Sequence, residues 1–245
     1  DEGMRLAQEL LDVPRDPKGN SGSGFSPAGT GRFGRMRMAV RGERWDFILA
    51  AAASEGSEDL PSSASWRFYA QALARMGKGD LEAARKLVAE FEASKPSGDV
   101  NKCALLEVSG RLAVLEGRFE EGLEKLKEAA KIEKDKFRVN DPPRYPRPLY
   151  ESLAWGLMQA EKWSEAEALL AAELAEEPEN GFALAQRVEV LAHLGRKDEA
   201  AAVLEVLGRV WKHADPTLPA LTRLGSACAD SGLRTLQPVR FAADA

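Results

Sequence analysis

The chain has 245 residues, of which 44% are hydrophobic and 30% charged, with 34 basic and 39 acidic side chains and a net charge of −5. This composition is too apolar for a disordered chain and too charged for a membrane protein, and no apolar run approaches the roughly 18 residues of a transmembrane helix. A mildly acidic chain also lacks the basic surface that nucleic acid requires, so no nucleic-acid partner is expected.

Apolar residues recur at helical rather than alternating spacing, and β-branched residues are sparse, which predicts an all-α protein. Residues 1–13 are expected to form one amphipathic N-terminal helix, the second half of an earlier repeat. Residues 14–31 are rich in Pro, Gly and Ser and predict a flexible linker. Helical repeats are expected over residues 32–212, a capping helix over 213–232 and a tail over 233–245.

A short pattern returns at the breaks between predicted helices: a turn residue, a charged residue, a large residue and, three positions farther on, a small residue. Four copies are complete, and the one at Glu43 is weaker because Ile48 takes the place of the small residue. The copies begin at Glu43, Gly79, Gly117, Glu161 and Gly195, so successive starts are 36, 38, 44 and 34 residues apart. A glycine at the turn ends one helix in the left-handed conformation, and acidic residues suit the start of the next. The small residue lets the two helices approach closely. These small residues are Ala84, Gly122, Ala166 and Ala200.

This pattern resembles the tetratricopeptide (TPR) repeat, whose period is 34 residues. The best copy spans about 147–178, and its matching residues are Tyr150, Leu153, Ala154, Leu157, Ala166, Leu170, Glu173 and Pro178. Other copies depart from the family pattern, with Lys134 in place of the closing proline and Val188 where a smaller residue is usual. The resemblance implies a right-handed superhelical solenoid of about five helix pairs plus capping helices, which binds a polypeptide in its concave groove.

The first helix of each TPR pair lines the concave groove, and register with the best copy indicates which residues face it. These residues are Trp66, Tyr69, Leu73, Met76, Glu107, Arg111, Glu151, Trp155, Met158, Phe182 and Glu189. Aromatic and Met side chains suit the anchoring of a peptide, and the charges suit its orientation. The alternative is that many of them only pack between neighbouring repeats. TPR modules that grip a terminal carboxylate use several basic and amide residues, whereas only Arg111 is basic here, so that specialised role is not expected.

A proline-rich insert over 138–148 lengthens one repeat interval. It resembles a Pro-Pro-x-Tyr-Pro junction found in a subset of bacterial TPR proteins. In one interpretation the insert is a recognition loop that presents Tyr145 and Arg147 at the groove. In the other it is a rigid spacer, since its prolines exclude helix and set the angle between two repeats.

The sequence contains no recognisable catalytic, metal-binding or cofactor-binding motif, so a non-catalytic scaffold is expected. Cys103 and Cys228 fit no metal-ligand spacing and are expected to be core residues, with a disulfide as the alternative. His193 lies near a predicted helix end, where a histidine suits the helix dipole.

Two other functions stay open. The chain could be a structural subunit of a larger complex that uses outer faces, such as the one bearing Lys125 and Lys127. It could also be an accessory domain of a thioredoxin-like enzyme, because some proteins of the bacterial subset carry such a domain ahead of the repeats. The sequence begins at Asp1 without a visible signal peptide, as expected for a processed protein or a trimmed fragment, and leaves the compartment open.

Overall fold

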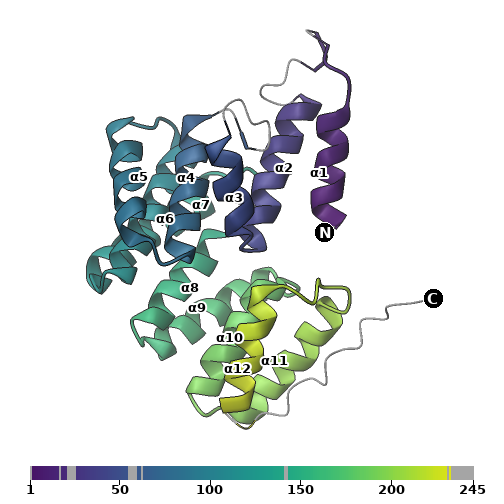
Figure 1. Ribbon diagram of the computed structural model, residues 1–245. Helices are drawn as coiled ribbons and strands as arrows, with labels where there is room; N and C mark the ends of the chain where they lie inside the picture. Colours follow the sequence, from purple (N-terminus) through teal and green to yellow (C-terminus); the bar gives the residue numbers. More distant parts are fainter. Residues whose placement is uncertain are drawn as a thin grey trace, which may run out of the picture.

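The computed structural model describes residues 2–16, 18–20, 26–54, 60–61, 63–140, 143–230 and 232 (Figure 1). Within these residues it contains twelve α-helices and no strand, which confirms the all-α prediction. The helices are α1 (Glu2–Asp12), α2 (Pro27–Arg41), α3 (Trp45–Ala53), α4 (Ala64–Gly77), α5 (Leu81–Ala93), α6 (Asp99–Leu115), α7 (Phe119–Lys136), α8 (Leu149–Gln159), α9 (Trp163–Glu176), α10 (Gly181–His193), α11 (Lys197–Val210) and α12 (Pro219–Asp230). None of the helices described is both long enough and apolar enough to span a membrane.

Five tight turns join α2 to α3, α4 to α5, α6 to α7, α8 to α9 and α10 to α11, at the positions that the sequence pattern predicts. Their residues with positive φ are Glu43 (52°), Gly79 (78°), Gly117 (78°), Glu161 (56°) and Gly195 (71°). The residue after each one donates its N–H to the carbonyl five positions earlier, at 2.8–2.9 Å. This bond closes a helix in the Schellman manner, so one local geometry recurs at all five breaks.

The small residues of the pattern lie where the two helices of a hairpin meet. Ala84, Ala166 and Ala200 are fully buried. Gly122 lies close to its neighbour helix, because a Cβ atom there would lie 2.7 Å from the carbonyl oxygen of Gly110. Close approach of the paired helices therefore depends on the absence of larger side chains at these positions.

The first helices of the five hairpins, α2, α4, α6, α8 and α10, form a row in which each contacts the next. Each second helix also contacts the first helix of the following hairpin, and α12 packs against α10. The row bends back on itself. Arg41, at the end of α2, forms an ion pair with Glu151 of α8 and lies over the ring of Phe182 of α10, 3.8 Å from its centroid. The first helix of the row thus reaches the fourth and fifth (Figure 1).

The predicted linker over 14–31 is too long, because α2 begins at Pro27. The Ser26 hydroxyl accepts the N–H of Gly29 and Pro27 occupies the first turn, which together start the helix. Asn20 is also buried, and its side chain donates to the carbonyls of Val13 and Pro14 and accepts the N–H of Ala28. Residues on both sides of the linker are therefore tied together; residues 17 and 21–25 lie outside the described part.

The predicted capping helix over 213–232 is also too long, since α12 spans Pro219–Asp230. Asp215 instead accepts the N–H and hydroxyl of Thr217, at 3.0 and 2.7 Å, and these bonds form a turn ahead of the helix. The predicted tail over 233–245 lies outside the described residues. Cys103 and Cys228 are both buried and are not joined in a disulfide, which confirms the expectation that they are core residues.

Candidate binding groove

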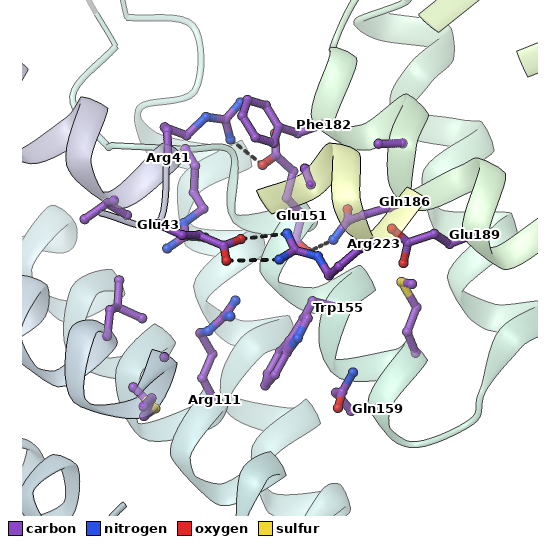
Figure 2. A pocket seen from close by; sticks show the side chains of 18 of the residues that line it. Arg41, Glu43, Arg111, Glu151, Trp155, Gln159, Phe182, Gln186, Glu189 and Arg223 are labelled. Atoms are coloured by element: carbon purple, nitrogen blue, oxygen red, sulfur yellow. Dashed lines mark hydrogen bonds and ion pairs between the residues drawn. The ribbon is translucent and has the colours of Figure 1, made fainter. Parts of the chain in front are cut away.

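The bend in the row of first helices encloses a cavity of about 310 Å³ (Figure 2). Its walls come from α2, α4, α6, α8, α10 and α12, from the turn after α2 with Trp45 at the start of α3, and from Arg147 of the proline-rich insert. Nine of the thirteen residues that the sequence places at the groove line this cavity: Leu73, Met76, Arg111, Arg147, Glu151, Trp155, Met158, Phe182 and Glu189. These nine come from four first helices and from the proline-rich insert, so the register of the repeat brings them to one place.

The other four predicted groove residues, Trp66, Tyr69, Glu107 and Tyr145, do not line the cavity and instead form a layer beneath it. The carboxylate of Glu107 is fully buried and accepts hydrogen bonds from the hydroxyls of Tyr69 and Tyr145, at 2.9 and 2.8 Å. The Trp66 ring packs against both tyrosine rings, with centroids 5.5 and 5.7 Å away. The two tyrosines point inward because the buried charge of Glu107 requires hydrogen-bond donors.

Arg147 connects this buried layer to the cavity. Its Nε lies 3.3 Å from a carboxylate oxygen of Glu107, and the Ser152 hydroxyl donates to the same oxygen. Burial alone would raise the pKa of Glu107. The pKa is nevertheless lowered, because Arg147, Arg111 and the hydroxyl donors all favour the ionised form. Glu107 is therefore a permanent buried charge.

The proline-rich insert presents its two candidate residues differently. Tyr145 is only 3% exposed and faces the aromatic layer, with its ring 5.8 Å from that of Tyr69. Arg147 reaches the cavity wall, but its guanidinium is held by Glu107. The insert is thus attached to α6 through one carboxylate. Residues 141 and 142 of the insert lie outside the described residues.

Three of the four arginines in the cavity wall have a carboxylate partner. Arg41 pairs with Glu151, and Arg147 pairs with Glu107. Arg223 of α12 donates to both oxygens of Glu43, at 3.0 and 2.6 Å, and so links the C-terminal helix to the first hairpin turn (Figure 2). The fourth is Arg111. Because of these pairs, most of the charge in the cavity is internally balanced.

Sequence reasoning missed Arg41, Glu43 and Arg223. Arg41 and Glu43 fall in one of the two more degenerate copies of the repeat, and Arg223 falls in the predicted cap. The ion pairs that they form join residues 110 and 180 positions apart. The spacing of residues along a helix gives no information on contacts between such distant residues. The helical register of α12 could have shown only that Arg223 lies on an exposed face.

Glu189 is the one carboxylate in the cavity wall without a hydrogen bond or ion pair to another described residue. Burial raises its pKa to about 7, an effect that nearby Arg223 opposes and Glu43 reinforces. The folded protein therefore holds a proton on this group more tightly than the unfolded chain does. This group alone should make stability fall as the pH rises from about 4.5 to 7 and stay level above that range.

We expect Glu189→Gln to remove this fall in the free energy of unfolding with rising pH. The variant should be more stable than the parent by about 1–2 kcal/mol at pH 8, after allowance for partial exposure, and equal to it within error near pH 4.5. Urea unfolding at both pH values measures the difference. Glu205→Gln, at an exposed position on α11, is the matched control and should change stability by the same small amount at both pH values. A constant difference for Glu189→Gln would contradict the assignment.

A comparison with models of known protein families gives no match, and a comparison with curated proteins gives none either. The cavity, its aromatic wall and its charges are therefore the basis on which a function can be proposed.

Proposed function

We propose that this chain is a TPR-like superhelical repeat protein, without catalytic activity of its own, that binds a segment of a polypeptide partner in the cavity on the concave side of its first helices. One observation carries the proposal: first helices from successive hairpins together line a single cavity. The five identical turns and the contacts of each hairpin with the next support the repeat assignment.

The chemistry of the cavity wall favours a peptide ligand. Trp155 is half-buried and carries Arg111 over its ring, and Phe182 meets Trp211 edge to face at 5.3 Å. Both rings are held in place by such contacts and can supply apolar area with little loss of conformational entropy on binding. Glu151 is paired with Arg41, which fixes the position of its carboxylate and suits the orientation of a ligand. A cavity of about 310 Å³ suits a few side chains rather than a folded domain.

Selection from a displayed library of random peptides, with the 245-residue chain as bait, tests this proposal. We expect enriched peptides whose affinity, measured by fluorescence anisotropy, falls at least about tenfold for Trp155→Ala. The matched control is Phe119→Ala, another aromatic truncation, at an exposed position at the start of α7 and away from the cavity. It should change the affinity less than about twofold.

Two results would overturn the groove as the binding site. One is a library that yields no enriched peptide. The other is an enriched peptide that binds Trp155→Ala as well as the parent, and sensitivity to Phe119→Ala instead would point to an outer-face interaction.

A further inference from the structure

One guanidinium and one carboxyl group in the cavity wall form no direct ion pair with another described residue. The three carboxylates of Glu43, Glu107 and Glu151 are held by Arg223, Arg147 and Arg41. What remains is the guanidinium of Arg111 on α6 and the carboxylate of Glu189 on α10. In the view of Figure 2, the side chains of Trp155 and Arg223 both lie between them, and Trp155 is the one beside Arg111.

Arg111 forms no direct ion pair with another described residue, although the charge of the nearby Glu107 acts on it. Its guanidinium lies over the Trp155 ring, 4.0 Å from the centroid, and Nη1 donates to the Ser152 hydroxyl at 3.4 Å. Burial, together with the neighbouring charge of Arg147, lowers the pKa of Arg111 to about 10. Glu107 is the nearest candidate counter-ion, but it already binds two tyrosines, Ser152 and Arg147. An anion that enters the cavity would give Arg111 a direct ion pair, which none of the described residues makes with it.

Glu189, in contrast, lacks a cationic partner among the described residues. Arg223 is the cation that influences its pKa, yet both oxygens of Glu43 already occupy that guanidinium. A carboxylate that is half-buried and unpaired loses hydration without a compensating contact. A cationic group that enters the cavity from the ligand would restore the missing interaction.

We propose that the bound segment carries an acidic side chain that pairs with Arg111 and a basic side chain that pairs with Glu189, with an apolar residue between them against Trp155. This inference rests on the proposed function, since it names the chemistry of the segment that the cavity takes. Charge complementarity on both sides of one aromatic ring fixes the direction of the segment as well as its composition.

The test repeats the library selection with the parent chain, Arg111→Gln and Glu189→Gln as separate baits. Peptides selected by the parent should be enriched in an acidic and a basic residue that flank an apolar one. Arg111→Gln should lose the acidic preference and keep the basic one, and Glu189→Gln should do the reverse. Arg111→Met, which keeps an unbranched side chain over the Trp155 ring, is a second variant in case Arg111→Gln folds poorly.

A double-mutant cycle with the tightest-binding peptide measures the interaction between its acidic residue and Arg111. Replacement of its acidic residue by the corresponding amide should weaken binding to the parent about tenfold and binding to Arg111→Gln less than about twofold. Amidation of the peptide C-terminus separates the two sources of carboxylate. A tenfold loss on amidation would assign the anion to a chain terminus and overturn the side-chain assignment.

The two proposals fail in different ways. Peptides that require Trp155 but show no charge preference on either side would overturn this inference and leave the groove intact. Peptides that bind without Trp155, or no peptides at all, would overturn the groove itself.

Discussion

We expect Glu107→Gln to lower the free energy of unfolding by about 3–5 kcal/mol, the largest loss from any single change considered for this protein. Glu107 is fully buried and neutralises Arg147, whose side chain is 14% exposed. The amide cannot balance that charge, and it replaces one oxygen acceptor with a donor that faces the hydroxyls of Tyr69 and Tyr145. Urea unfolding at pH 7 measures the loss.

The matched control is Glu128→Gln on α7. Glu128 also pairs with a basic side chain, Lys102 at 2.6 Å, but its side chain is 49% exposed. An exposed pair contributes little, so we expect a change below about 1 kcal/mol. Similar losses in the two variants would contradict the central role of Glu107.

A double variant separates the charge from the hydrogen bonds. In Glu107→Gln with Arg147→Met, the uncompensated cation is absent, so we expect part of the lost stability to return, about 1–2 kcal/mol relative to Glu107→Gln alone. No recovery would indicate that the tyrosine contacts, rather than the ion pair, account for the effect.

The hairpins could be predicted from the sequence because their information is local. Each turn has one residue with positive φ, and four of the five have a small residue five positions later, so both features are visible in a window of a few residues. Gly117 and Gly122 illustrate this, with a φ of 78° at the turn and a close helix contact after it. Helix ends were less predictable. The start of α2 depends on Ser26 and Pro27, within a stretch whose Gly and Ser content favours a linker.

The sequence could predict which helix faces line the cavity, but not which of their residues are buried beneath it. Helical register correctly indicates that Arg111 and Trp155 lie at one cavity, because both are on first helices. It does not indicate that Glu107, one turn before Arg111, is buried beneath the cavity, since that depends on Tyr145 and Arg147 from the distant insert. Pairs such as Glu43 with Arg223 depend on the curvature of the whole row, which no local pattern encodes.

The second large effect is expected at Gly122, where α7 approaches α6. A Cβ at this position would lie 2.7 Å from the carbonyl oxygen of Gly110 and 2.6 Å from Cγ2 of Val114. A backbone atom cannot move aside without a shift of the whole helix, so we expect Gly122→Ala to lower the free energy of unfolding by about 2–3 kcal/mol, despite the higher helix propensity of alanine.

Gly225→Ala is the matched control, because Gly225 is also inside a helix, α12, but a Cβ there would meet nothing within 4 Å. Only the propensity gain applies, so this variant should be more stable than the parent by up to about 1 kcal/mol. Urea unfolding should therefore give changes of opposite sign for the same chemical substitution. Equal signs would show that close approach of α6 and α7 does not determine the need for glycine at position 122.

Hydrogen exchange on the same two variants tests whether each hairpin is stabilised mainly by its neighbours. If each hairpin is stabilised mainly by its neighbours, Gly122→Ala should reduce amide protection most in α6 and α7, less in α4 and α8, and least in α11, which contacts α10. Gly225→Ala should leave protection in α6 and α7 unchanged. A uniform loss across all helices in Gly122→Ala would instead indicate one cooperative unit, and the proposal of stacked, nearest-neighbour repeats would then be wrong.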